Sequence, residues 1–428
     1  FAFFFFFENC IRPFFLALIF HKLPPSLNIA QTSANLNLTQ TTFKYKTSSY
    51  YSISCGKISV MIDRRLASNF NWLYFLSILL VSVIGVVTIY SANHARPEEF
   101  FRGLYIKQIY WICYGLIAML VALALDYRWF SRYAYLIYAL TIIGLGYVLL
   151  NGVVVSGSKR WIRISSVSIQ VSEFAKIAII IVLAKYFESG KLSGQYTLHD
   201  LIVPALLTAT IGGFIVVQPD LGTTMMILFI FLAFIVAIEI NQATLIKLFI
   251  GGLALAPTLW FVLKGYQKAR LRTLFNPELD PLGAGYHSIQ SKIAIGSGGF
   301  WGKGLFAGTQ SRLNFLPEKH TDFIFTLFAE EHGFQGSLGL LLIYIIIIYR
   351  VLRVGTISRS YFAKLFCYGY ASSIFFYISV NMSMVLGLLP IVGSPLPIMS
   401  YGGSSMLATM IGFAIVMSAK INHKQLIA

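Results

Sequence analysis

Residues 200–239 read DLIVPALLTATIGGFIVVQPDLGTTMMILFIFLAFIVAIE, and this stretch decides the fold class. Two apolar runs, 200–217 and 222–239, lie on either side of a short polar turn. A helix that crosses a bilayer needs about 20 mostly apolar residues, and proline with glycine in the turn interrupts a helix. We therefore expect two antiparallel membrane-spanning helices, with Asp220 capping the second.

Eight more apolar stretches have a similar length. The composition agrees, because 57% of the 428 residues are hydrophobic and 11% are charged, whereas soluble domains have about 45–50% and about 25%. These values exclude a soluble enzyme, and they exclude disorder for most of the chain. The sequence predicts an all-α polytopic membrane protein with about ten transmembrane helices. The eight stretches are 72–90, 107–125, 133–151, 171–187, 243–263, 322–349, 361–387 and 402–419.

Residues 1–60 differ from the rest of the chain. Six of the first seven residues are phenylalanine, and the first methionine of the chain is Met61. We interpret residues 61–428 as one transmembrane domain and residues 1–60 as a non-native or upstream-translated segment, which we expect to be disordered. A transit peptide is the alternative, since such peptides are also rich in serine and poor in acidic residues.

The net charge of +17 admits nucleic acid, an anionic membrane surface or an anionic substrate as partners. No basic helix or arginine-rich run is present, so we expect no nucleic acid. The four cysteines lack metal-ligand spacing. If both ends of 61–428 are cytoplasmic, the short inner loops carry more lysine and arginine than the short outer loops, as the positive-inside rule requires. The long segment 264–321, between the seventh and eighth spans, then lies outside, and its cations indicate an anionic ligand there.

The segment 264–321 is rich in glycine, and we expect it to be ordered rather than a flexible linker. Its match to a phosphate-binding P-loop is poor, so we expect no nucleotide. Glu278 and Asp280 are its first two carboxylates, and in an extended backbone both point to the same side. Asp280 could act as a general base, worth ~10²–10⁴-fold in rate. A surface carboxylate that neutralises Arg270 or Arg272 is equally compatible with the residues alone.

Two short polar motifs lie at expected membrane edges. Arg160 can bind phosphate oxygens through two hydrogen bonds, and Trp161 follows it. The same two residues are equally typical of an interfacial anchor. Glu173 and Lys176 are three residues apart at the start of a span and therefore share a helix face. Ionisable residues inside a span pair with each other or line a cavity, and the two interpretations are compatible.

The last two motifs adjoin the eighth and tenth spans. His320, Asp322 and Glu330 cannot all face lipid, yet no metal-ligand spacing is present. Proline and glycine interrupt helices in 388–405, and at membrane depth such backbone is tolerated only against protein or a water-filled cavity. We expect 388–405 to pack on the same outer-face site.

Several strings together resemble the SEDS family (RodA, FtsW and SpoVE) of bacterial cell-wall polymerases. They are PELDPLGAGYHSIQSKIAIGSGGFWGKG at 277–304, LPEKHTDFIFTLFAEEHG at 316–333 and LPIVGSPLPIMSYGGSS at 389–405. QPDLGTT, GSKRWI and SEFAK occur in the expected order, and the resemblance covers 61–428. The wording is more similar to the elongation branch, RodA, than to the division branch, FtsW.

The resemblance implies a peptidoglycan glycosyltransferase that polymerises lipid II for cell elongation and rod shape. The reaction would take place at the outer face of the bacterial cytoplasmic (inner) membrane. The resemblance also implies ten spans and a shape similar to other lipid-sugar (GT-C-like) transferases. The family's essential acidic residue corresponds to Asp280, and its charged pair corresponds to Glu173 and Lys176. Val171 and His332 depart from the family's common proline and leucine, and neither is the proposed base.

We hypothesise that Asp280 takes the proton of the acceptor sugar hydroxyl of lipid II, while a growing glycan on a lipid diphosphate is the donor. Arg160, Lys292 and Lys303 are candidates to stabilise the departing diphosphate. A divalent cation such as Mg²⁺ or Mn²⁺ can share that role. The remaining substrate-binding candidates are Trp161, Glu173, Lys176, His320 and Asp322.

The resemblance also implies partners, namely a class B penicillin-binding protein, which supplies transpeptidation, and other membrane proteins of the elongation complex. Two other functions stay open on the residues. A lipid II flippase would also have many spans and intramembrane charges, although the half-helix breaks and internal repeat of a transporter are not evident. A non-catalytic scaffold for the penicillin-binding protein would tolerate the loss of Asp280.

Overall fold

The computed structural model describes most of the chain after residue 51, and it divides at residue 70 into two units. The described residues are 52–55, 58–61, 70–94, 103–155, 158–164, 167–190, 195–238, 240–262, 265–280, 283–308 and 320–422. In the first unit, β1 (Ser52–Cys55) and β2 (Ile58–Met61) form an antiparallel hairpin. The rest of the prediction made for residues 1–60 lies outside the described residues.

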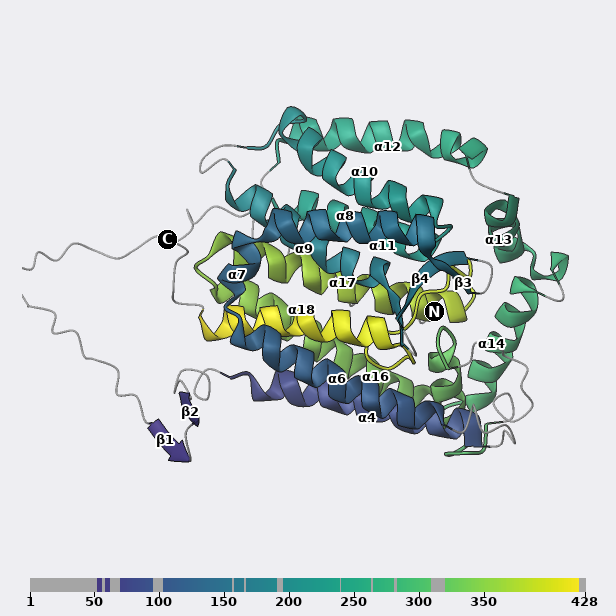
Figure 1. Ribbon diagram of the computed structural model, residues 1–428. Helices are drawn as coiled ribbons and strands as arrows, with labels where there is room; N and C mark the ends of the chain where they lie inside the picture. Colours follow the sequence, from purple (N-terminus) through teal and green to yellow (C-terminus); the bar gives the residue numbers. More distant parts are fainter. Residues whose placement is uncertain are drawn as a thin grey trace, which may run out of the picture. The chain divides into compact units, whose positions relative to one another are not determined.

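A helix lies at each of the ten expected spans, so the prediction of a mostly helical, multi-span membrane protein is confirmed (Figure 1). Among the described residues, six helical segments are long and apolar enough to cross a membrane, and they are α4, α6, α8, α16, α18 and the segment His199–Val217, which contains α10. Their bounds are α4 (Trp72–His94), α6 (Leu104–Ala124), α8 (Ala134–Asn151), α10 (Ile202–Val217), α16 (Ile324–Ile357) and α18 (Gly403–Ile421). The other four are α9 (Val171–Glu188), α11 (Leu221–Ala237), α12 (Gln242–Val262) and α17 (Tyr361–Val385). Two short helices, α7 (Tyr127–Arg132) and η2 (His199–Leu201), precede α8 and α10.

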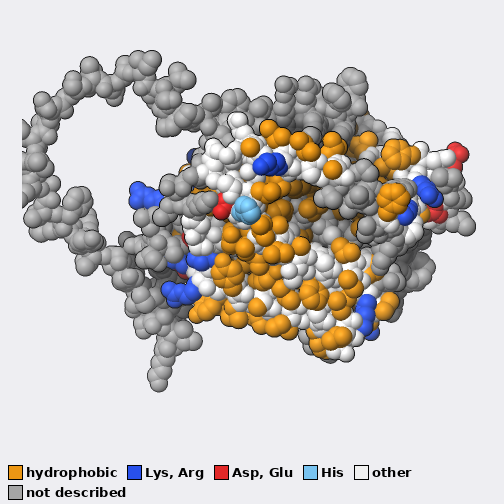
Figure 2. Space-filling view, turned by 90° about the horizontal axis from the view of Figure 1, so that it is seen from above, with side chains coloured by type: hydrophobic (Ala, Val, Ile, Leu, Met, Phe, Trp, Pro, Cys, Tyr) orange, Lys and Arg blue, Asp and Glu red, His pale blue; other side chains and the backbone are white. Residues whose placement is uncertain are grey.

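Burial separates the central helices from those that face lipid. Residues Ile177–Ala184 of α9 are all buried, and α17 and α18 are buried along most of their length. The outer helices instead expose large apolar side chains, and hydrophobic atoms cover most of the described surface in Figure 2. Such a surface suits a hydrocarbon environment and would be unusual in water.

Small residues let the central helices approach closely. A Cβ atom added at Gly369 of α17 would lie 2.5 Å from the ring of Phe234 on α11. Because lipid tails are as apolar as leucine, helices in a membrane associate through close packing of this kind rather than through the hydrophobic effect. We infer that this contact sets the spacing of α11 and α17.

The turn between α10 and α11 forms as predicted. The Asp220 carboxylate accepts hydrogen bonds from the backbone N–H of Thr223, at 3.2 Å, and from its hydroxyl, at 2.9 Å. These bonds satisfy groups at the N-terminus of α11 that have no partner within the helix. Asp220 is therefore an N-cap, and the expected antiparallel hairpin is present.

A small antiparallel sheet follows α8 and was not predicted. Its strands are β3 (Val153–Val155), β4 (Ser158–Ile164) and β5 (Val167–Gln170), in the order β3-β4-β5. Apolar and polar residues alternate in β5 (VSIQ), which is the strand period, but this strand has only four residues, and β4 (SKRWIRI) does not alternate. The sheet places the GSKRWI motif on β4 at the end of the helices where α13 and α14 lie (Figure 1).

The long loop before α16 is ordered over its described part, as expected. It contains α13 (Gly265–Phe275), the 3₁₀ turn η3 (Pro277–Leu279) and α14 (Ala284–Gly298), and α13 and α14 run across the ends of the spanning helices (Figure 1). The predicted extended backbone around Glu278 and Asp280 is wrong, because η3 turns the chain there. Proline at the first position of η3 has the backbone angle that such a turn needs.

Candidate functional site

Asp280 has a fixed position between η3 and α14. Its backbone N–H donates to the carbonyl of Pro277, at 3.3 Å, and its carbonyl accepts from the N–H of Tyr286, at 3.2 Å. The half-buried carboxylate lies over Gly283, where an added Cβ would be only 2.5 Å from Oδ2 and 2.7 Å from Oδ1. The carboxylate thus lies at the N-terminal end of α14, where unpaired N–H groups and the helix dipole favour a negative charge.

A buried serine fixes α14 to the spanning helices. Ser291 donates to the carbonyl of Val385 at the end of α17, at 2.6 Å, and lies 2.9 Å from the hydroxyl of Thr326 on α16. Both hydroxyl-bearing residues are fully buried. The next residue, Lys292, is exposed, and its side chain lies against Gly387, so its ammonium group is near the C-terminal end of α17. A cation is favoured at that end of a helix.

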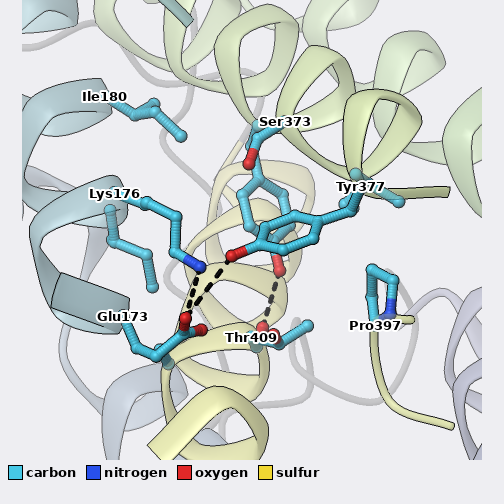
Figure 3. A pocket seen from close by; sticks show the side chains of 11 residues that line it. Glu173, Lys176, Ile180, Ser373, Tyr377, Pro397 and Thr409 are labelled. Carbon is cyan, nitrogen blue, oxygen red and sulfur yellow. Dashed lines mark hydrogen bonds and ion pairs between the residues drawn. The ribbon is translucent and has the colours of Figure 1, made fainter. Parts of the chain in front are cut away.

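Glu173 and Lys176 face a pocket among α9, α17 and α18, as Figure 3 shows. Lys176 Nζ lies 2.7 Å from Glu173 Oε1, so the predicted pair is present. Lys176 Nζ also lies 4.1 Å from the centre of the Tyr377 ring, and the Tyr377 hydroxyl is 3.5 Å from Glu173 Oε1. Pro397 and Thr409 line the opposite side of the pocket. Both charged groups are therefore buried and paired, and they line one cavity whose other walls include several apolar side chains.

Arg160 contacts the turn between α10 and α11. Its guanidinium donates to the carbonyls of Gln218, at 3.3 Å, and of Pro219, and lies 3.6 Å from Asp220 Oδ1. Asp220 in turn is close enough to Lys176 to interact with it electrostatically. In this structure Arg160 therefore binds the turn between α10 and α11. Trp161, the next residue, pairs with Val153 and Gln170 within the sheet.

The segment between α17 and α18 packs around His320 and Asp322, as expected. The N–H of Tyr401 donates to the carbonyl of His320, at 2.9 Å. The buried amide of Asn381 bridges the carbonyls of Asp322, at 2.8 Å, and Ser394, at 2.7 Å. The same segment supplies Pro397 to the pocket, whereas His320 and Asp322 are not among the residues that line it.

Lys303 lies apart from the other predicted cations. Its Nζ is 2.8 Å from Oε1 of Glu330, a fully buried residue of α16. Lys303 follows the C-terminal end of α14, whereas Asp280 precedes the N-terminal end. The structure therefore does not bring Lys303 to Asp280.

Sequence reasoning missed the aromatic and small side chains of the pocket. Tyr377, Ser373 and Thr409 lie inside apolar spans, and nothing in their local pattern distinguishes them from packing residues. Among the described residues, no three His, Cys, Asp or Glu side chains lie close enough together to hold a metal ion, and the divalent cation stays a prediction.

Comparison with known proteins gives a consistent family. Residues 71–425 match the family model FTSW_RODA_SPOVE, described as "Cell cycle protein". The chain is 39% identical to the peptidoglycan glycosyltransferase MrdB of Escherichia coli (strain K12) over 360 residues, covering 82% of this chain and 93% of that protein. It is 33% identical to the peptidoglycan glycosyltransferase RodA of Treponema pallidum (strain Nichols), covering 84% of this chain and 99% of that protein.

Solved structures agree with the sequence relatives. The fold matches a chain of a peptidoglycan synthase complex that coordinates polymerization and crosslinking, with a TM-score of 0.71, 28% identity, and coverage of 83% of this chain and 99% of that chain. It also matches the rod shape determining protein RodA of Thermus thermophilus, with a TM-score of 0.62, 26% identity, and coverage of 83% and 98%. The fold is RodA-like, and the chain belongs to the FtsW/RodA/SpoVE family, which is the SEDS family.

Proposed function

We propose that this chain polymerises lipid II into glycan strands for cell elongation, with Asp280 as the general base. The enzyme class rests on homology, since the curated relatives are named peptidoglycan glycosyltransferases. The observation that supports Asp280 as the general base is the position of its carboxylate over Gly283, at the N-terminal end of α14. There it is half-buried, and two backbone hydrogen bonds fix the residue that carries it.

The chemistry needs one base and a good leaving group. The acceptor sugar hydroxyl of lipid II attacks the sugar carbon that carries the diphosphate of the growing glycan, and its proton passes to the Asp280 carboxylate. A glycosidic bond forms, the bond from carbon to the diphosphate oxygen breaks, and the lipid diphosphate leaves with the electron pair. Glycoside hydrolysis, by contrast, needs two carboxylates. The diphosphate leaves as an anion, so one carboxylate suffices here.

Cations near the outer ends of the helices are the candidates to hold the diphosphate. Lys292 is exposed on α14, the helix that begins beside Asp280, and Arg160 is half-buried beside Asp220. Fixed positive charge in such a site stabilises charge that develops on the leaving group. The pair Glu173–Lys176 lines the pocket among α9, α17 and α18 and would bind a polar part of the lipid-linked substrate, with Trp161, His320 and Asp322 as further contacts.

The partner and the orientation belong to the same proposal. A class B penicillin-binding protein would crosslink the strands, together with other elongation-complex proteins, and the likeness to a chain of a peptidoglycan synthase complex supports such a partner. Both ends of 61–428 would be cytoplasmic and the site would face outward. The short-loop charge bias supports this orientation.

The test uses the purified full-length protein, alone and with its transpeptidase partner, on lipid II. Glycan products are separated on a gel beside the variant Asp280→Ala. We expect strands from the wild type and none from the variant, at equal protein amounts.

Three outcomes would contradict the proposal. Strands from both proteins would remove Asp280 from the chemistry. No strands from either, with lipid II moved across vesicles by the wild type, would establish a transporter. No strands and no movement, together with strands made by the partner, would establish a scaffold.

A further inference from the structure

The helix α16 is broken where the loop after α14 meets it. Gly333, inside α16, has φ 64° and ψ −160°, which lie outside helical values. A break leaves backbone N–H and C=O groups without partners in the helix, and inside a membrane these groups must be satisfied by other backbone. The segment 299–304 provides those partners.

Four backbone hydrogen bonds join the segment 299–304 to the break. Two carbonyls of α16 before the break accept from the loop, and two N–H groups after the break donate to the loop. The bonds are Lys303 N–H to Glu330 O at 3.1 Å, Gly304 N–H to Glu331 O at 2.9 Å, Phe334 N–H to Gly299 O at 2.9 Å and Gln335 N–H to Phe300 O at 3.2 Å. These four bonds therefore fix the alignment of the segment 299–304 with the residues of α16 on both sides of Gly333.

Glycine makes this alignment possible. A Cβ at Gly302, where φ is 83°, would collide with the carbonyl of Glu331, and a Cβ at Gly333 would collide with the N–H of Gly302. Both glycines have positive φ, which other residues adopt at a cost. The close approach of two backbones leaves little freedom for the loop to slide along α16.

The ion pair of Lys303 with Glu330 lies at the centre of this junction. The Glu330 side chain is fully buried, whereas the Lys303 side chain is 26% exposed. A buried carboxylate is strongly unfavourable without a compensating partner, so breaking such a pair from one side destabilises its surroundings. Lys303 brings that partner from the loop, 27 residues before Glu330 along the chain.

The length of α14 separates this junction from the base. The helix has 15 residues, and at 1.5 Å per residue it is about 22 Å long. A lysine side chain reaches only about 6 Å from its Cα. Lys303 therefore cannot contact a phosphate beside Asp280, although one rigid helix connects the two ends.

We propose that Lys303 and Glu330 are a positioning pair that fixes the far end of α14, so that the near end holds Asp280 in register with the substrate. The inference rests on the proposed function of Asp280. It replaces the expected role of Lys303 as a contact to the departing diphosphate. The far end of α14 is then fixed by this ion pair, and its middle is fixed by the hydrogen bonds of Ser291.

A double-variant experiment on the full-length protein tests this proposal. Initial rates of lipid II polymerisation are measured over a range of lipid II concentrations for Lys303→Met, Glu330→Gln and the double variant. We expect Lys303→Met to lower kcat about tenfold or more with KM within about twofold, because it removes the cation that is ion-paired with the buried Glu330 carboxylate. The double variant removes both charges and should recover kcat to within about threefold of the wild type. Arg163→Met, which removes an exposed cation of β4, is the matched control and should behave as the wild type.

Two results would overturn the proposal. A double variant as slow as Lys303→Met, with KM raised in both, would show that Lys303 binds substrate. A wild-type kcat in Lys303→Met would show that no pair is needed. If Lys303→Met fails to fold, the double variant still decides, since it should fold and turn over, and Lys303→Arg should retain the wild-type kcat. Asp280→Asn is assayed in parallel, because its full activity would refute the proposed base and leave the junction untouched.

Discussion

Two lysine–glutamate pairs of nearly equal length lie in different surroundings. Lys176 and Glu173 are 2.7 Å apart within one helix and face a pocket, whereas Lys303 and Glu330 are 2.8 Å apart and join a loop to a spanning helix. Three residues separate the first pair along the chain, and 27 separate the second. The distance between lysine and glutamate alone therefore does not show whether an ion pair binds a ligand or joins two segments. A pair that faces a cavity can meet a ligand, and a pair at a backbone junction holds two segments together.

Neutralising Glu173 and Lys176, the pocket pair, should give the largest effect and distinguishes this pair from Lys303 and Glu330. We expect Glu173→Gln, Lys176→Met and their double variant all to lose about 100-fold in polymerisation rate, because restoring neutrality does not restore the charges that we propose to bind substrate. Initial rates on lipid II measure this.

The other end of α9 offers the control for the pocket pair. Lys185 and Glu188 are 3.0 Å apart with the same spacing but are partly exposed, so Lys185→Met should change the rate by less than about twofold. If the double variant of Glu173 and Lys176 recovered the wild-type rate, both lysine–glutamate pairs would be structural. The proposed difference between their roles would then be refuted.

We expect the next largest effect from displacing the Asp280 carboxylate. Gly283→Ala would place a Cβ 2.5 Å from Asp280 Oδ2 and displace the carboxylate. Because small misplacements of a catalytic group are costly, we expect a loss of about 10–100-fold in kcat at unchanged thermal stability. Gly296→Ala, in the same helix with nothing within 4 Å, should leave kcat unchanged. Equal rates for the two variants would mean that the position of the carboxylate over Gly283 does not matter for turnover.

Tyr377 should give the smallest effect. Its ring lies 4.1 Å from Lys176 Nζ, and a cation–π contact of this kind contributes about 0.5–2 kcal/mol. We expect Tyr377→Leu to lower the rate about fivefold and Tyr377→Phe, which keeps the ring, by less than about twofold. A loss in Tyr377→Phe as large as in Tyr377→Leu would assign the effect to the hydroxyl instead.

The sequence predicts those features that depend on neighbours along the chain. The length of apolar runs located ten helices, and helical spacing paired Glu173 with Lys176. The turn residues around Asp220 predicted its capping role in the same way. Each of these features forms within one or two adjacent elements, so local physical rules suffice.

The features that were missed depend on distant contacts. The partner of Lys303 is defined by the break at Gly333, and no spacing in the sequence connects them. Tyr377 is a site residue only because α17 passes α9, and the extended backbone expected at Asp280 gave way to a 3₁₀ turn that packs under α14. Such contacts are chosen by tertiary packing among residues far apart in the chain.

The central claim is that Asp280 is the base of a lipid II polymerase. The most direct test compares the initial polymerisation rates of Asp280→Asn and Glu278→Gln, two neutralised carboxylates on the same turn, of which Glu278 is exposed. We predict that Asp280→Asn loses ~10²–10⁴-fold, the usual contribution of a general base, while Glu278→Gln retains the wild-type rate. Equal rates for Asp280→Asn and the wild type, at equal amounts of folded protein, would contradict the claim.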